Sequence, residues 1–269
     1  CANGAAYRTA PDALYELGAE VVPLAIMPDG FNINEDCGAV HPQVMAAAVV
    51  AHGADAGICL DGDADRLIMA DENGTIIDGD QILGCLALAM QEKGTLSKNT
   101  VVGTVMSNRG LETMLGKADI DLYRVAVGDR YILEKMRNDG FNLGGEPSGH
   151  ILMTDFARSG DGLLSALQML TLLKGSTKKA STLFNGFKPN PQQLKNLTGI
   201  DPIILRREPL QAAIREIETG LGRRGRVLVR PSGTEALIRV MVGAESEQLL
   251  TATMDALMLS ITEELDKNT

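Results

Sequence analysis

Short apolar runs alternate along the chain with longer amphipathic stretches, and turn-forming residues separate them. Apolar runs bounded by Gly, Pro, Asn or Asp predict strands, whereas apolar positions spaced three or four residues apart predict helices. The predicted strands are 21–26, 56–60, 66–70, 100–106, 122–126, 142–145, 149–154, 193–197, 226–230 and 237–242. The predicted helices are 10–17, 42–52, 81–92, 109–117, 129–138, 162–173, 208–219 and 246–265, with a short helix and a linker within 175–190.

Two consecutive stretches repeat one plan, in which strands and helices alternate and a polar loop lies between two final strands. The polar loop is 61–66 in the first stretch and 145–150 in the second. Such alternation predicts a largely parallel sheet with helices on both faces, and ligands bind such sheets at the strand ends. The predicted strands of the last stretch are antiparallel, with helices segregated from them. We therefore predict an α/β protein with two mixed or parallel-sheet α/β domains (1–76, lacking its first strand, and 77–184) and a smaller α+β domain (185–269).

The first polar loop carries carboxylates at alternate positions, Asp61, Asp63 and Asp65, between two apolar runs. Anions this close repel one another unless a cation neutralises them. Carboxylate oxygens suit Mg²⁺, which takes a few protein ligands and completes its shell with water or phosphate. Gly62 and Ala64 are small, so the backbone can fold tightly and direct the carboxylates to one point. The loop therefore predicts a magnesium site.

Three other interpretations of the acidic loop stay open. A solvated acidic turn would need no apolar flanks. An EF-hand loop would place Glu72 at its twelfth position, but its sixth position is Arg66 where that loop needs Gly. An aspartyl-phosphate phosphatase motif also begins Asp-x-Asp after a strand, but it normally continues with Thr or Val, where this chain has Asp65.

Composition restricts the classes of partner. The chain of 269 residues is 45% hydrophobic, which is ordinary for a globular protein, and its net charge is −10. An acidic chain binds nucleic acid and membrane surfaces poorly, so we expect neither as a partner. Cys59 and Cys85 lie in apolar runs and the four cysteines show no metal-type pairing, as expected for free thiols in a reducing cytoplasm. No apolar run approaches membrane-spanning length.

Hydrogen-bond donors that could bind a phosphate group lie at 230–234, between two predicted strands. Gly233 permits a turn in which backbone N–H groups converge, Ser232 and Thr234 add hydroxyl donors, and Arg230 can bind phosphate bidentately. The alternative is an ordinary hairpin with an exposed arginine. Arg239, in the following strand, either supports this loop or forms a structural ion pair.

The remaining candidates lie on the second polar loop and at a helix start. Glu146 and Ser148 suit the hydroxyl groups of a sugar, and His150 either binds the ligand or only supports a neighbour. Asp129 and Arg130 either cap the helix that starts there or contact the substrate.

Arg66 adjoins the acidic loop. Its guanidinium either stabilises a phosphoryl group during transfer or forms a salt bridge that orients Asp61 or Asp65.

The loop Asp61-Gly-Asp-Ala-Asp65-Arg66 resembles the metal loop of the α-D-phosphohexomutase superfamily. Gly145-Glu-Pro-Ser-Gly-His150 and Arg230-Pro-Ser-Gly-Thr-Glu235 match the superfamily in the same order. Within it, four further segments are most similar to the bacterial phosphoglucosamine mutase family, and the resemblance covers essentially the whole chain. These segments are Cys1-Ala-Asn-Gly-Ala5, Met106-Ser-Asn108, Val127-Gly-Asp-Arg-Tyr131 and Ser159-Gly-Asp-Gly162.

The resemblance implies an isomerase that interconverts glucosamine 6-phosphate and glucosamine 1-phosphate for UDP-N-acetylglucosamine synthesis. It assigns Mg²⁺ to the three aspartates and phosphate binding to Arg230, Ser232, Gly233 and Thr234, and we predict Arg66 as the catalytic residue of this chain. It assigns the sugar to Glu146 and Ser148. We predict His150, Asp129 and Arg130 as further substrate contacts, and a homodimer stays open.

The resemblance also places the phosphorylated serine in a first domain, within a Ser-His-Asn-Pro type motif that this sequence does not contain. The chain opens with a loop-like Cys1-Ala-Asn-Gly and has no initiator Met, so we expect an upstream part to be missing and the chain alone to be inactive. A phosphomannomutase or phosphoglucomutase of the same superfamily, and a non-catalytic phosphosugar-binding fragment, stay open as alternatives.

Overall fold

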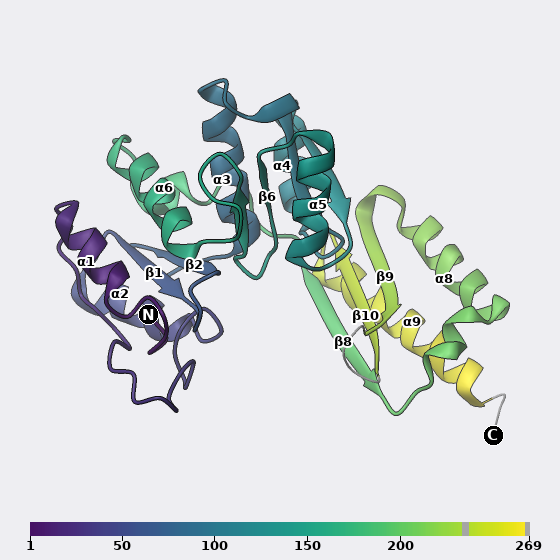
Figure 1. Cartoon of the computed structure of the whole chain (residues 1–269). Helices are drawn as coiled ribbons and strands as arrows, with labels where there is room; N and C mark the ends of the chain where they lie inside the picture. Colours follow the sequence, from purple (N-terminus) through teal and green to yellow (C-terminus); the bar gives the residue numbers. More distant parts are fainter. Residues whose placement is uncertain (233–236, 267–269) are drawn as a thin grey trace. The chain divides into compact units, whose positions relative to one another are not determined.

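The computed structural model describes residues 1–232 and 237–266 (Figure 1). It divides into two compact units, each described here by itself. Unit 1 comprises 1–107 and 111–188, and unit 2 comprises 108–110 and 189–269. The predicted α/β class is confirmed, with helices and strands alternating along the chain.

The first sheet of unit 1 has the order β1-β2-β3, with β1 (Ala56–Leu60) antiparallel to β2 (Leu67–Asp71) and β2 antiparallel to β3 (Ile76–Ile77). These pairings differ from the largely parallel sheet that the alternation predicts. The loop 61–66 explains the difference, because a parallel pair needs a crossover of a dozen or more residues. α1 (Thr9–Glu16) and α2 (Gln43–His52) precede the sheet, close to their predicted bounds.

The prediction of a strand at 21–26 is wrong. Ala25 has a φ of +50°, which interrupts extended backbone, and Pro23 lacks the N–H that a ladder needs. Among the described residues, the backbone of this segment accepts hydrogen bonds from the chain start, where the Cys1 ammonium donates to Leu24 O and the Asn3 N–H donates to Ala25 O. Proline within the apolar run was the signal against a regular strand.

The second sheet of unit 1 has the order β5-β4-β6-β7 and is mixed, as predicted. β4 (Thr100–Thr104) is parallel to β5 (Asp121–Val125) and to β6 (Leu143–Gly145), while β6 is antiparallel to β7 (Ile151–Met153). The helices are α3 (Gly79–Glu92), α4 (Arg109–Lys117), α5 (Asp129–Asp139), α6 (Gly162–Lys174) and α7 (Ala180–Leu183), with a 3₁₀ turn at Ser97–Asn99. The short strands β6 and β7 form a hairpin that carries the second polar loop.

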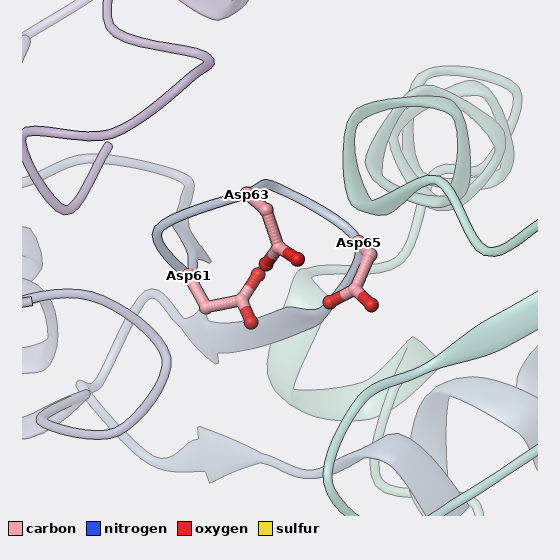
Figure 2. A group of neighbouring side chains, drawn as sticks. All are labelled: Asp61, Asp63 and Asp65. Carbon is pink, nitrogen blue, oxygen red and sulfur yellow. The ribbon is translucent and has the colours of Figure 1, made fainter. Parts of the chain in front are cut away.

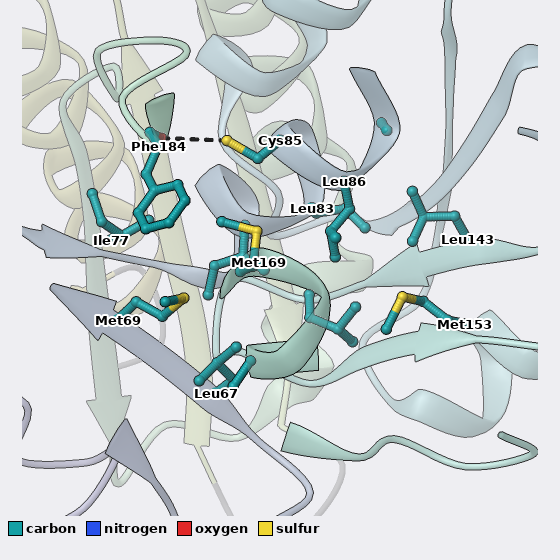
Figure 3. Packing of buried hydrophobic residues seen from close by; sticks show 14 of the residues in the cluster. Leu67, Met69, Ile77, Leu83, Cys85, Leu86, Leu143, Met153, Met169 and Phe184 are labelled. Carbon is teal, nitrogen blue, oxygen red and sulfur yellow. Dashed lines mark hydrogen bonds between the residues drawn. The ribbon is translucent and has the colours of Figure 1, made fainter. Parts of the chain in front are cut away.

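One apolar core holds both polar loops of unit 1 in place. Leu67 from β2, Leu143 from β6 and Met153 from β7 belong to the same buried cluster, together with α3 and α6 side chains such as Leu83 and Met169 (Figure 3). Burying each such side chain contributes about 1.5–3 kcal/mol. Cys85 also lies in this core, where its thiol donates to Phe184 O at 3.7 Å. The β1–β2 and β6–β7 hairpins are therefore supported by the same set of contacts.

Unit 2 is an antiparallel sheet of order β8-β10-β9 with two long helices, which agrees with the predicted α+β plan. Its elements are β8 (Gln192–Thr198), α8 (Glu208–Leu221), β9 (Gly225–Pro231), β10 (Leu237–Ala244) and α9 (Glu247–Asp266), with 3₁₀ turns at Pro202–Arg206 and Gly222–Arg224. A separate core of Val240, Leu257 and Ile261, among others, joins the helices to the sheet. In the described residues no helix is long and apolar enough to cross a membrane.

Candidate functional site

The three aspartates of the loop between β1 and β2 converge, as their spacing predicts. One carboxylate oxygen from each of Asp61, Asp63 and Asp65 lies within 4.8 Å of the other two (Figure 2). Asp61 is buried, Asp65 is half-buried and Asp63 is exposed. The cluster is therefore anchored at one side and open to solvent at the other.

Backbone contacts from two distant segments fix the shape of the acidic loop. The Ala5 N–H donates to Gly62 O at 2.7 Å, and the Gly162 N–H donates to Ala64 O at 2.8 Å. Between these contacts Ala64 adopts a φ of +63°, a left-handed conformation that costs a non-glycine residue about 1–2 kcal/mol. Strain of this kind persists where the surroundings impose it and is common at functional sites.

Arg66 partly neutralises the aspartates. Its Nε lies 2.6 Å from Asp61 Oδ2 and 3.5 Å from Asp65 Oδ1, and its backbone N–H donates to Asp61 Oδ1 at 3.1 Å. This is the orienting salt bridge that was one of the two interpretations of Arg66. Three carboxylates against one guanidinium leave two net negative charges, which match a divalent cation.

The oxygens themselves suit a metal ion. Within the described part of the chain, Asp61 Oδ2 and Asp65 Oδ1 are buried and accept no hydrogen bond, although both lie near Arg66 Nε. An unsatisfied buried carboxylate oxygen is costly unless a cation or donor satisfies it. The donor set, its spacing and its charge therefore fit Mg²⁺.

The structure joins the acidic loop directly to the second polar loop. Nδ1 of His150 lies 3.1 Å from Asp65 Oδ2, Arg66 and His150 form a β-bridge, and the Leu67 N–H donates to Gly149 O at 3.0 Å. Gly149 has a φ of +94°, and a Cβ there would lie 2.2 Å from Leu67 O, so a close approach of the two hairpins requires glycine. His150 thus supports Asp65, a contact between residues far apart in the sequence.

Glu146 and Ser148 differ in how far the protein already uses them. The Glu146 carboxylate accepts a hydrogen bond at Oε1 from the Gly128 N–H, at 3.0 Å, while Ser148 is exposed. The contact fixes the direction of the Glu146 side chain by a backbone group at the start of α5. Sequence reasoning missed Gly128 as a partner, because a backbone donor leaves no residue-type signal.

Asp129 and Arg130 both lie exposed in the first turn of α5. Gly128 occupies the N-cap position, and among the described residues no side chain caps the helix. Asp129 Oδ1 instead accepts from the Arg130 N–H at 2.7 Å. Both residues follow Gly128 directly and so lie near the second polar loop, which Gly128 contacts through Glu146. Neither is the N-cap residue, so the interpretation that they cap the helix is wrong.

Gly160, in the Ser159-Gly-Asp-Gly162 segment, lies against the other side of His150. A Cβ on Gly160 would lie 2.3 Å from His150 Nε2. That nitrogen is buried and, in the described residues, has no hydrogen-bond partner. The segment continues into α6, whose N-cap Asp161 accepts from the Leu164 N–H at 2.9 Å. Its glycines were a sequence signal for this close approach.

The predicted phosphate loop belongs to unit 2 and is described only in part. Arg230 lies directly opposite Arg239 on the paired strands β9 and β10, which places two cations side by side. Like charges in this position destabilise a sheet unless an anion or acid lies nearby. The Ser232 N–H donates to Leu237 O at 2.8 Å, while Gly233 and Thr234 lie outside the described residues.

Three family models match the chain in order. They are the phosphoglucomutase/phosphomannomutase alpha/beta/alpha domain II over residues 1–74, alpha/beta/alpha domain III over 78–189 and the C-terminal domain over 193–260. A phosphoglucosamine mutase of Parvibaculum lavamentivorans is 54% identical over 255 residues, which are 95% of this chain and 57% of that protein. One of Rhodospirillum centenum is 54% identical over 266 residues, 97% of this chain and 56% of that protein.

Solved structures agree in fold. A phosphoglucomutase/phosphomannomutase family protein from Burkholderia thailandensis has a TM-score of 0.83 at 24% identity, over 98% of this chain and 59% of that one. An Aspergillus fumigatus N-acetylphosphoglucosamine mutase in complex with GlcNAc-6P and magnesium has a TM-score of 0.74 at 20% identity, over 97% and 60%. The chain thus spans a little more than half the length of the relatives that it matches. The resemblance detected in the sequence is confirmed, and the chain belongs to the phosphoglucomutase/phosphomannomutase family of α-D-phosphohexomutases.

Proposed function

We propose that this chain supplies the metal-binding, sugar-binding and phosphate-binding parts of a phosphoglucosamine mutase, which interconverts glucosamine 6-phosphate and glucosamine 1-phosphate. The observation that supports this most is the direct link between the aspartate cluster and the second polar loop through Asp65 and His150. Such a link holds a cation site and a hydroxyl-binding loop at a fixed separation. Relatives more than 50% identical are phosphoglucosamine mutases, which favours the amino sugar over other hexoses.

Asp61, Asp63 and Asp65 would hold Mg²⁺, each with one carboxylate oxygen. When bound there, Mg²⁺ neutralises negative charge on phosphoryl oxygens and orients them. Arg66 keeps Asp61 and Asp65 in position, and its guanidinium is close enough to the cluster to stabilise the charge of a phosphoryl group during transfer.

Glu146 and Ser148 would bind the sugar hydroxyls. Glu146 keeps one carboxylate oxygen for a hydroxyl while the Gly128 N–H fixes the other, and the exposed Ser148 hydroxyl both donates and accepts. His150, Asp129 and Arg130 lie on or beside the same loop and complete the set of substrate contacts that we propose.

Arg230, Ser232, Gly233 and Thr234 would hold the phosphate of the substrate that is not being transferred. The guanidinium can bind a phosphate group with two parallel hydrogen bonds, and the neighbouring hydroxyl and N–H groups add further donors. One such loop could hold either end of the sugar, since the reaction passes through a bisphosphate that must be bound in both orientations.

The phosphoryl group would come from a phosphoserine outside this chain. It would pass to the free hydroxyl of the sugar phosphate, and the other phosphoryl group of the resulting bisphosphate would return to the serine. We therefore expect no mutase activity from residues 1–269 alone. The product would serve UDP-N-acetylglucosamine synthesis.

Turnover by the product of the intact gene tests the proposal. Glucosamine 6-phosphate, mannose 6-phosphate and glucose 6-phosphate are compared at equal concentration, and the highest kcat/KM is expected for the amino sugar. A preference for mannose or glucose would reassign the protein to a phosphomannomutase or phosphoglucomutase of the same family. Absence of turnover with all three would support a non-catalytic phosphosugar-binding protein instead.

The division of roles within the site is tested in the same protein. Arg230→Ala should raise KM for both the 1-phosphate and the 6-phosphate sugar. The expected loss of binding free energy is about 1.5–3 kcal/mol, the contribution of a hydrogen bond to a charged group. Glu146→Gln should instead lower kcat while inorganic phosphate still binds, because it perturbs hydroxyl contacts that orient the sugar. Unchanged kinetics in Arg230→Ala would refute the assigned phosphate loop.

A further inference from the structure

A cavity in unit 1 lies at the far end of the β6–β7 hairpin from the second polar loop. Its volume is about 590 Å³, within the range of small-molecule sites. It is lined by residues at the end of α5, at the start of β6 and just after β7. Nothing in the proposed reaction uses this part of the structure.

The antiparallel hairpin separates the cavity from the candidate sugar site. Residues 146–150 connect β6 to β7 at one end, whereas Asn142 and Thr154 lie at the other, where the Thr154 N–H donates to Asn142 O at 3.1 Å. Three-residue strands rise roughly 10 Å at about 3.3 Å per residue. Helix α5 also extends from the end with the polar loop to the end with the cavity. Gly128 at its start lies near Glu146, and Gly140 at its end lines the cavity.

Two arginines give the cavity its charge. Arg137 lies in the last turn of α5 and Arg158 follows β7, and both side chains are exposed. Neither guanidinium forms an ion pair or hydrogen bond with any residue that the structure describes. In a chain of net charge −10, two arginines at one cavity that form no ion pair with any described residue are unusual. They can bind an anion.

Two negative charges near the cavity are smaller in sum than the two positive charges of Arg137 and Arg158. The C-terminal end of α5 carries a partial charge of about −0.5, which two guanidinium groups exceed. Asp155, which also lines the cavity, accepts a hydrogen bond at Oδ2 from Asn142 Nδ2 at 2.6 Å. The Asp155 carboxylate and the helix end together carry about −1.5, so two guanidinium groups leave the lining slightly positive.

The polar wall is rigid before any ligand binds. Asn142 is buried, its Oδ1 accepts from the Ser97 N–H at 2.9 Å, and its Nδ2 also donates to Thr95 O at 2.8 Å. Its side chain is therefore held by two segments of the chain, 95–97 and the residues just after β7. A preformed wall lowers the entropy cost of binding.

The half-buried side chains of Leu133 and Phe141 make up the accessible apolar part of the lining, and Met136 beside them is fully buried. Lys98 Nζ lies 5.8 Å from the centre of the Phe141 ring and donates to Asp139 O, which keeps a third cation close to the cavity. An apolar surface beside two arginines suits a molecule with an uncharged body and one anionic group.

We propose that this cavity binds a small organic phosphate, with the phosphoryl group between Arg137 and Arg158 and the uncharged body against Leu133 and Phe141. Phosphate is the anion that two planar guanidinium groups bind best, since each can donate two parallel hydrogen bonds. This site is separate from the phosphate loop of the proposed mutase reaction, so either assignment can fail without the other.

The test is an NMR titration of ¹⁵N-labelled 1–269 with phenyl phosphate, inorganic phosphate and benzyl alcohol. Phenyl phosphate should shift the amide signals of Gly140, Phe141 and Thr154 in a saturable way, at least tenfold more tightly than either other probe. Arg137→Ala and Arg158→Ala should each weaken this binding at least fivefold, and the double variant should abolish it. Both residues are exposed, so thermal unfolding should stay nearly unchanged and serve as the folding check.

Two control variants separate this site from other anion binding. Arg8→Ala removes an exposed arginine elsewhere in unit 1 and should leave the titration unchanged. Arg230→Ala should also leave the shifts of Gly140, Phe141 and Thr154 intact. Shifts that never saturate, or that survive in the double variant, would show an adventitious ion only. Loss of these shifts in Arg230→Ala, with Arg137→Ala unaffected, would equally overturn the proposal.

Discussion

Two hairpins of unit 1, β1–β2 and β6–β7, carry loops of similar plan that differ in charge and in hydrogen bonding. In the first, three carboxylates face one another and two buried oxygens accept no hydrogen bond among the described residues. In the second, the charged side chain, Glu146, already accepts a hydrogen bond from a backbone N–H, and Ser148 is exposed. These contacts support the proposal that the first loop binds a cation and the second binds neutral hydroxyl groups.

The difference shows how one core supports two kinds of chemistry. The same buried cluster holds both hairpins, and direct backbone contacts at Leu67 and Gly149 lock them together. The position of each loop therefore depends on packing, whereas its ligand preference depends on a few side chains. Substitutions at the junction should affect stability, and substitutions on the loops should affect binding.

The largest expected effect is at the junction of the two hairpins. Gly149→Ala places a Cβ 2.2 Å from Leu67 O on a residue with a φ of +94°. The backbone strain and the overlap with backbone atoms should together lower the free energy of unfolding by about 3 kcal/mol or more. Urea denaturation measures this loss.

Gly53→Ala is the matched control. Gly53 ends α2 with a φ of +63°, but a Cβ there would meet nothing within 4 Å. The control should therefore lose only about 1 kcal/mol, the usual difference at a left-handed helix end. Equal losses in the two variants would mean that the hairpins are not held together by this close contact.

A smaller effect should follow from changing Glu146. Glu146→Ala leaves the Gly128 N–H without its acceptor, which should cost about 1–2 kcal/mol of unfolding free energy. Glu146→Gln keeps an acceptor oxygen and should lose less than half as much. If both variants were as stable as the unchanged chain, the Gly128 contact would not position this side chain.

The smallest effect concerns Asp78, the N-cap residue of α3. This helix start contacts the second polar loop, because the Gly79 N–H donates a hydrogen bond to Pro147 O. Burial raises the pKa of Asp78 above its ordinary value of 3.8, and this outweighs the bonds from Gln81 and Asp80 N–H groups, which lower it. The folded state then holds the proton more tightly than the unfolded state does. The contribution of Asp78 to stability is therefore fully present below pH 3.8 and is lost as pH rises through the folded pKa.

Asp78→Asn keeps an oxygen acceptor for the cap but does not titrate. Relative to this variant, the unchanged chain should lose stability between pH 4 and pH 7, as measured by urea denaturation at each pH. A gain in relative stability with rising pH would show that the N–H bonds of the cap outweigh burial.

Sequence patterns predicted most of the local structure and part of the site. Alternating aspartates between apolar runs predicted the cluster at Asp61, Asp63 and Asp65, because spacing within one short loop limits where side chains can go. Gly53 marked the end of α2, since a left-handed helix end favours glycine. Features that depend only on residues close together in the sequence can be predicted from the sequence.

Long-range contacts could not be predicted in the same way. The bond from Gly128 to Glu146 uses a backbone donor, and the Asp65–His150 pair joins residues whose proximity depends on how two hairpins pack. The antiparallel pairing of β1 with β2 also overrode the parallel arrangement expected from alternation, because the joining loop is short. These features depend on tertiary packing, which residue spacing alone does not encode.

The most direct test of this account is calorimetric titration of 1–269 with Mg²⁺, because the acidic loop is its central claim. Weak, saturable binding is expected, and Asp63→Asn should weaken it at least tenfold, about 1.4 kcal/mol. Asp55→Asn, which removes an exposed carboxylate just before β1, should leave it unchanged. Identical titrations for the unchanged chain and Asp63→Asn would contradict the assignment of this loop as a metal site.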